Sequence, residues 1–274
     1  MVQSTQPGIE SPTPSRPQFR TETATTRRIY AVLWWCLPII GFLILWEVAS
    51  RLRWFNSQLL PPPTIVFGAI AEYFISGEIW PHLLASLYRG VTGFALAVLC
   101  VPLGILIGWF KFADRLISPL VEFFRQIPAL AMFPVFLVLL GLGYSSQIGM
   151  VIWAAAWPIL LTSISGTRAV DPRLVKAART LGARPIDLFT KVALPAAVPS
   201  IATGLRLGGS YAFLVLVSAE MIGANSGLGF LVLNNQYLYR IPQMYASIVI
   251  LAVIGLCVNY LLIAGERSVS SWRT

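Results

Sequence analysis

The chain has 274 residues, of which 57% are hydrophobic and only 11% are charged. With a mean hydropathy of +0.74, this composition excludes a water-soluble globular protein, because no water-facing fold could hide so much apolar surface. The formal net charge of +9 requires no nucleic-acid partner, since positive cytoplasmic loops beside an anionic inner leaflet account for it. The expected solvent of this chain is membrane lipid.

The chain begins with a segment rich in Pro, Ser, Thr and Arg that holds too few apolar residues to pack. Residues 1–28 are therefore predicted to be a disordered cytoplasmic tail. The apolar window that follows could instead belong to a secretory signal peptide, whose apolar region is about 7–15 residues long and precedes small residues. This window is longer and ends at Ser50 and Arg51, so we predict that it remains as a first membrane span.

Six windows are long and apolar enough to cross a hydrocarbon core about 30 Å thick, which requires about 20 helical residues. They are residues 29–49, 91–110, 117–142, 147–165, 199–222 and 245–264. A helix satisfies its own backbone polar groups in lipid, and no window alternates as a barrel strand would. The sequence predicts an all-α membrane protein with one six-span helical bundle over residues 29–266 and a cytoplasmic tail over 267–274.

The positions of Lys and Arg indicate the orientation, because cytoplasmic loops retain positive charge. With the amino terminus inside, 14 of the 20 basic residues fall in cytoplasmic segments. Arg51, Arg53, Arg89 and Arg240 fall on the opposite side, and Arg125 and Arg206 fall inside spans. Both termini and a long loop over residues 166–198 are therefore predicted to be cytoplasmic.

This long loop carries the signals of two short helices. Asp171 is predicted to cap the first helix, with Pro172 at its first position, and Gly182 suits the left-handed residue that ends it. Pro185 is predicted to open the second helix, before the chain turns back toward the bilayer at residues 194–195.

Each of these two helices has one apolar side. The apolar residues are Leu174, Val175, Ala178 and Leu181 on the first helix, and Ile186, Phe189 and Val192 on the second. One hypothesis is a rigid knob that inserts into a groove on another protein. The other is an amphipathic pair that rests on lipid headgroups, and composition alone does not separate the two.

Residues 176–195 follow the pattern Lys-Ala-Ala-x3-Gly-x9-Val-x-Leu-Pro. This spacing resembles the EAA loop of permease subunits from binding-protein-dependent ABC importers, whose form is Glu-Ala-Ala-x3-Gly-x9-Ile-x-Leu-Pro. The matching residues are Ala177, Ala178, Gly182, Leu194 and Pro195, while Val192 replaces the isoleucine and Lys176 replaces the glutamate. The last departure reverses a charge.

Other stretches are similar to the branch of this family that imports sulfonates, taurine, nitrate or related compounds. They are Leu60-Pro61-Pro62-Pro63, Ser86-Leu87-Tyr88-Arg89, Arg125-Gln126-Ile127-Pro128-Ala129-Leu130-Ala131, Gly204-Leu205-Arg206 and Ala219-Glu220. The resemblance covers about residues 30–265 and implies the type I ABC importer permease fold, in a bacterial inner membrane. It favours a small oxyanion as the transported solute, although permeases for thiamine-precursor pyrimidines are also similar.

In such permeases the loop forms coupling helices that sit in a cleft of a cytoplasmic ATPase. The resemblance implies this role here for Asp171, Lys176, Ala177, Ala178, Gly182, Leu194 and Pro195. It also implies a homodimer of permease copies, two ABC ATPase subunits that bind MgATP, a periplasmic solute-binding protein and alternating access. Because the chain contains no Gly-x4-Gly-Lys-Ser/Thr phosphate-binding motif, we expect ATP hydrolysis in the partner and no cofactor in this chain.

Charged residues inside a span are candidates for a substrate pathway, because a charge at the bilayer centre costs at least about 2.5–3.5 kcal/mol. Arg125 and Arg206 could offer forked donors to an oxyanion, and Gln126 and Glu220 complete the candidate set. For the two arginines, the alternatives are snorkelling to the inner headgroups or pairing with carboxylates, for which Glu122 and Asp187 are the candidates.

Two glutamates lie near the outer ends of predicted spans. We expect Glu47 and Glu220 to pair with Arg51, Arg53 or Arg240, or to contact the delivering protein. Elsewhere, Gly104 and Gly108, and likewise Gly204 and Gly208, form pairs of small residues that let helices approach closely. Ordinary packing and a moving bundle are both compatible with these pairs.

Two other classes of function remain as alternatives. A membrane-embedded hydrolase or metal enzyme would need more than the single histidine, His82, which is predicted to lie in an outer amphipathic segment. The three cysteines lie in three different apolar windows and imply neither disulfides nor metal. A passive channel or stand-alone carrier is the remaining alternative, and it would transport without an ATPase.

Overall fold

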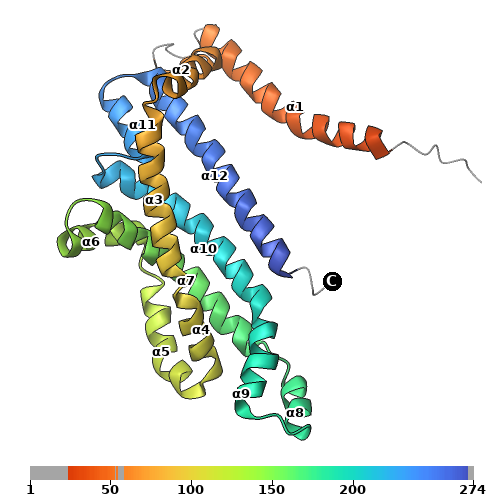
Figure 1. Cartoon of the computed structure of the whole chain (residues 1–274). Coiled ribbons are helices and arrows are strands. Elements are labelled where there is room, and N and C mark those ends of the chain that lie inside the picture. The colour runs from red at the N-terminus through yellow and green to blue at the C-terminus, as the bar shows by residue number, and fades with distance from the viewer. Residues whose placement is uncertain (1–23, 53, 55–58, 271–274) are drawn as a thin grey trace, which may run out of the picture.

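The structure, a computed structural model, describes residues 24–52, 54 and 59–270, and this part is helical with no strand. In chain order its helices are α1 (Ala24–Arg51), α2 (Pro63–Ser76), α3 (Ile79–Ala97), α4 (Cys100–Trp109), α5 (Lys111–Phe124), η1 (Ala129–Met132), α6 (Phe133–Leu140), α7 (Tyr144–Arg168), α8 (Pro172–Thr180), α9 (Pro185–Leu188), the π-helical turn η2 (Phe189–Ala193), α10 (Leu194–Gly223), α11 (Leu228–Tyr237) and α12 (Ile241–Ser270). The bundle is elongated, with α2 and α11 toward one end and α8 and α9 at the other (Figure 1). The predicted all-α fold is confirmed.

Four helical stretches are long and apolar enough to cross a membrane. They are Ile79–Trp109, Tyr144–Arg168, Pro185–Gly223 and Ile241–Val269, and they cover the windows predicted at 91–110, 147–165, 199–222 and 245–264, except for Phe110. The first of them begins at Ile79 rather than at residue 91. The sequence placed this boundary too late because His82 and Arg89 look like residues of an exposed segment, whereas α3 carries both of them.

The window predicted at 117–142 is not one continuous helix. It is divided between α5 and the η1–α6 segment, which meet at 90°. Pro128 explains the break, because it lacks a backbone N–H and disfavours helical geometry at the residue before it. With this bent pair counted as one span, the described part of the chain contains five candidate spans.

The first predicted span, 29–49, lies in α1. The helix begins at Ala24, so it includes the end of the predicted tail, while residues 1–23 lie outside the described residues. Side chains of α1 are described from Leu37 onward. Figure 1 shows α1 pointing away from the other helices, and contacts between its end and α2 include a 3.1 Å hydrogen bond from the Thr64 hydroxyl to Glu47.

α7 is the central helix, with α3, α4 and α10 packed against it. The small-residue pairs produce these close approaches: a Cβ added to Gly104 would lie 2.8 Å from the carbonyl oxygen of Leu160, and one added to Gly208 would lie 3.0 Å from that of Ala155. Apolar side chains from α3, α7 and α10 fill the space between them. The predicted packing role of these glycines is therefore confirmed.

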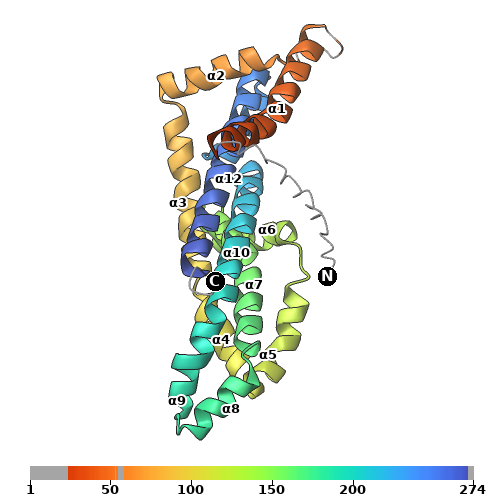
Figure 2. The same cartoon turned by 90° about the vertical axis from the view of Figure 1, so that its right-hand side faces the viewer.

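Contacts at the two ends of the bundle fix which connections lie together. At one end, the rings of Trp109 and Phe189 meet edge to face with centroids 5.3 Å apart, and Arg168 forms an ion pair with Asp114. At the other end, the Asn235 amide donates a 2.6 Å hydrogen bond to the Tyr73 hydroxyl and joins α11 to α2. Figure 2 shows α8 and α9 at the far end from α2 in a second view.

Candidate functional site

The predicted pair of short helices is present at the end of the bundle formed by α8 and α9. The Asp171 carboxylate caps α8 by accepting a 2.8 Å hydrogen bond from the Arg173 N–H. Gly182 follows α8 with a φ of +81°, a left-handed conformation that favours glycine. α9 begins at Pro185, so the predicted start and end signals of the first helix and the start of the second are confirmed.

The predicted turn at residues 194–195 is wrong. The chain passes from α9 through the π-helical turn η2 directly into α10, and Pro185–Gly223 forms one continuous helical stretch. Pro195 does not end the helix: it lies in the first turn of α10, directly after the π-helical turn η2. The second short helix is therefore a direct extension of a membrane span.

Part of the apolar side of this helix pair is uncovered. Leu174, Leu181 and Ile186 are 55%, 87% and 62% exposed. Lys176 and Ala177 are also exposed, and Ala178 is half-buried. At the other end of the pair, Leu188 is buried, and the ring of Phe189, directly after α9, contacts the Trp109 ring of α4. The helix pair thus presents apolar side chains to the surroundings at the tip of the molecule.

A second site, which the sequence did not predict, lies deep in the bundle between α3 and α10. Arg89 and Glu220 are both fully buried and form an ion pair with a 2.8 Å distance between Nη1 and Oε1. The Ser86 hydroxyl donates to the same carboxylate at 2.7 Å, and the Gly229 N–H donates to it at 3.0 Å. The Glu220 carboxylate thus has three donors, which compensate for its removal from water.

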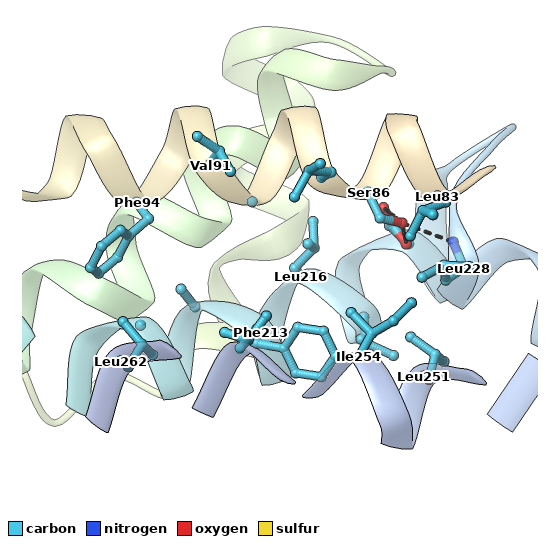
Figure 3. A pocket seen from close by; sticks show the side chains of 17 residues that line it. Leu83, Ser86, Val91, Phe94, Phe213, Leu216, Leu228, Leu251, Ile254 and Leu262 are labelled. Atoms are coloured by element: carbon cyan, nitrogen blue, oxygen red, sulfur yellow. Dashed lines mark hydrogen bonds between the residues drawn. The ribbon is translucent and has the colours of Figure 1, made fainter. Parts of the chain in front are cut away.

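The same cluster holds the connection between α10 and α11. Arg89 also donates to the carbonyl oxygen of Ser226 at 2.7 Å, and its guanidinium lies 4.2 Å from the centre of the Tyr144 ring. Ser86 accepts from the Leu228 N–H at 2.9 Å, the contact seen in Figure 3. Gly227 has a φ of +123°, and an added Cβ would lie 2.5 Å from each carboxylate oxygen of Glu220. The site therefore requires glycine at this position.

This cluster corrects two predictions. Glu220 pairs with Arg89, not with Arg51 or Arg240, and Arg89 lies inside a span rather than on the outer side; Arg53 lies outside the described residues. The prediction for Glu47 is confirmed, since its carboxylate lies 2.6 Å from Arg51. Part of the signal was available: Glu220 lies within the window 199–222, and a charge at depth requires a counter-charge.

The other pathway candidates lie apart from this cluster. Arg125 pairs with Glu122 at 2.5 Å, as one alternative predicted, and both side chains are exposed beside Gln126 at the break between α5 and α6. Arg206 pairs with Glu266 of α12 at 2.6 Å. Asp187, the other carboxylate considered for the arginines, pairs with Lys191 at 2.7 Å. The three charged pathway candidates are therefore held in three separate ion pairs: Arg125 with Glu122, Arg206 with Glu266, and Glu220 with Arg89.

A cavity of about 150 Å³ lies between α3, α10 and α12, and its lining is apolar apart from two polar residues, Ser86 and Glu220. Figure 3 shows Phe94, Phe213 and Ile254 among its walls and Ser86 near one end. An oxyanion would lose its hydration here without gaining donors, because Ser86 already donates to Glu220. The cavity therefore does not suit a small anionic solute.

Residues 100–270 match the family model described as binding-protein-dependent transport system inner membrane component. The chain is 37% identical over 219 residues to a probable ABC transporter permease protein of Brucella abortus (strain 2308), covering 80% of this chain and 88% of that protein. It is 33% identical to SsuC of Bacillus subtilis (strain 168), named for aliphatic sulfonates transport, over 86% of both chains. The taurine transport system permease protein TauC of Escherichia coli (strain K12) is 31% identical, over 84% of this chain and 86% of that protein.

The fold is also similar to a solved structure, an inward-facing form of the MetNI methionine ABC transporter. The TM-score is 0.56 at 23% identity, over 70% of this chain and 94% of that chain. The likeness supports the fold, and the relatives above support the family. The chain therefore belongs to the family of binding-protein-dependent transport system inner membrane components and is the multi-pass permease subunit of an ABC importer.

Proposed function

We propose that this permease receives a small oxyanion from a periplasmic binding protein and passes it across a bacterial inner membrane by alternating access. The names of two relatives, SsuC for aliphatic sulfonates and TauC for taurine, favour a sulfonate-like solute. A separate cytoplasmic ATPase with bound MgATP supplies the energy, and this chain itself is not catalytic. Two copies of the chain form a homodimer around the pathway.

The observation that carries this proposal is the helix pair at the tip of the molecule. Leu174, Leu181 and Ile186 are exposed apolar side chains on short, capped helices, and the second helix continues into the α10 span. A groove on a partner protein would cover these side chains. A displacement of α9 would be transmitted directly to the membrane-spanning part of α10, because no flexible loop separates the two helices. We assign the coupling role to Asp171, Lys176, Ala177, Ala178, Gly182, Leu194 and Pro195.

For the substrate pathway, we propose Arg125 and Gln126 at the break between α5 and α6, and Arg206 on α10. An oxyanion would exchange for the carboxylate that each arginine contacts, and the exposure of the Arg125–Glu122 pair makes that exchange the less costly of the two. Glu220 is assigned to the buried cluster rather than to the pathway, because its carboxylate is surrounded by donors.

The coupling assignment is tested by co-purifying the permease with its ATPase and replacing Gly182 with valine. A β-branched residue does not easily adopt the φ of +81° found here, so we expect the variant to lose ATPase binding and transport. Gly68→Val in α2 is the matched control, since an added Cβ there meets nothing within 4 Å. Unimpaired assembly and transport in Gly182→Val would overturn the assignment, and transport by the permease reconstituted alone would favour a stand-alone carrier.

A further inference from the structure

The coupling helices carry a marked excess of positive charge. Six basic and two acidic residues lie between positions 168 and 191. Both acidic groups are engaged within the loop, because Asp171 caps α8 and Asp187 pairs with Lys191 while accepting from the Arg184 N–H. Within residues 168–191, all of which the structure describes, the basic residues that form no ion pair with a described residue are Arg173, Lys176, Arg179 and Arg184.

Three of these basic residues form a stripe on α8. Arg173, Lys176 and Arg179 follow one another at intervals of three residues, which places neighbouring members on adjoining parts of one helix surface. All three are exposed. Leu174 and Leu181 are separated by seven residues and share the neighbouring surface, so the tip presents an exposed apolar strip beside a basic strip.

We propose that the basic stripe selects the ATPase partner, and that the groove receiving α8 is lined with acidic residues, with a carboxylate opposite Lys176. This inference rests on the proposed coupling function. An apolar contact that buries Leu174 and Leu181 would also exclude water from the adjacent cations, and desolvated cations require paired charge. Lys176 occupies the position at which the EAA form has a glutamate. An ATPase whose groove complements a glutamate would therefore face a charge of the wrong sign at Lys176 and would bind this permease poorly.

The anionic headgroups of the inner leaflet are the competing partner for a basic surface. The position of the loop favours an ATPase groove over headgroups as the partner of the basic stripe. In both views α8 and α9 form the extremity of the bundle, beyond the connection between α4 and α5 (Figures 1 and 2). The exposed Leu181 and Ile186 side chains on either side of Gly182 also match a groove, which would cover apolar and charged residues together.

The test measures the affinity of the full-length permease, in detergent and in nanodiscs, for its own ATPase over a range of salt concentrations. We expect Lys176→Glu to weaken binding on the order of tenfold at low salt, and Lys176→Gln to weaken it less, because reversal adds repulsion to the lost attraction. Changing one acidic groove residue of the ATPase to lysine should restore the affinity for the Lys176→Glu permease, and it should not raise the affinity for the wild-type permease. Lys111→Glu, an exposed cation outside the loop, is the matched control and should bind as the wild type does.

The outcomes separate the two levels of the proposal. If the wild-type permease binds no ATPase, the coupling function itself fails. If it binds, but Lys176→Glu binds equally well at every salt concentration, the acidic groove is wrong and the coupling function stands. If Lys176→Glu keeps full ATPase affinity and loses activity only in nanodiscs with anionic lipid, the stripe contacts headgroups and the proposal is overturned.

Discussion

Arg89 and Glu220 are charged side chains that the fold buries among apolar helices. An isolated charge at bilayer depth costs at least about 2.5–3.5 kcal/mol, but here each ion faces its counter-ion at 2.8 Å and further hydrogen bonds complete the arrangement. Removing one partner leaves the other charge uncompensated, which costs more than removing both. The packing of α3 against α10 and α11 therefore depends on these two side chains.

We predict that Glu220→Gln lowers the apparent melting temperature of the detergent-purified permease by about 10 °C, since breaking a buried pair costs about 3–5 kcal/mol. Differential scanning fluorimetry measures the change. Glu122→Gln is the matched control because its ion pair with Arg125 is exposed, and we expect a shift of about 2 °C or less.

A double-mutant cycle separates the ion pair from general packing. The variant that carries both Arg89→Gln and Glu220→Gln should be less destabilised than the sum of the single variants, because no unpaired charge remains in it. Additive effects would show that the two side chains stabilise the bundle independently.

The sequence did not predict this pair because 131 positions separate the two residues. Sequence reasoning could estimate the depth of Glu220 within a span, but it could not determine which basic residue would face it. The local predictions at Asp171 and Gly182 were correct because capping and left-handed geometry depend only on neighbouring residues.

At the scale of helices, contacts between α4, α7 and α10 depend on missing side chains. A Cβ on Gly104 would lie 2.6 Å from the Cβ of Ser163, and one on Gly108 would lie 2.7 Å from the carbonyl oxygen of Ile164. Neither backbone nor Cβ atoms can move aside as the end of a flexible side chain could. These two glycines therefore set how closely α4 approaches α7.

We predict that Gly104→Ala destabilises the permease by about 1–3 kcal/mol, the usual cost of overpacking. Gly68→Ala is the control, since an added Cβ meets nothing within 4 Å at that position and alanine favours a helix more than glycine does. Thermal unfolding of both variants in the same detergent measures the difference. Equal melting temperatures would contradict the close approach of α4 to α7.

Helix boundaries were predicted less well than helix centres. The angle of 90° at which α5 and the η1–α6 segment meet near Pro128 could not be read from the sequence. Sequence reasoning also misplaced the turn before α10, because a proline at residue 195 is compatible with either the end or the first turn of a helix. Such choices are decided by how the flanking helices pack.

For the whole molecule, basic residues gather at one end. Lys111, Arg168 and the α8–α9 region lie at that end, whereas Arg240 lies between α11 and α12 at the other. A bilayer that keeps positive loops on the cytoplasmic side would then place α8 and α9 in the cytoplasm.

Cysteine labelling in intact cells tests this orientation. Cys36, Cys100 and Cys257 are first replaced by alanine in a background that retains transport, and one cysteine is then introduced in α8 by Thr180→Cys or in α11 by Tyr237→Cys. Both positions are exposed. We expect a membrane-impermeant maleimide to label Tyr237→Cys in intact cells and Thr180→Cys only after permeabilisation, and the reverse pattern would contradict the orientation.

The sequence by itself determined the all-α membrane class, the family and the capped helix pair, because hydropathy and capping are properties of short segments. Only the tertiary structure decided that Arg89 faces Glu220, that α5 and α6 meet at a right angle and that α9 continues into α10. These features depend on which distant residues share a small volume inside the bundle. In lipid, burial of charge and close packing of glycine select among helix arrangements that the hydrophobic pattern alone would accept equally.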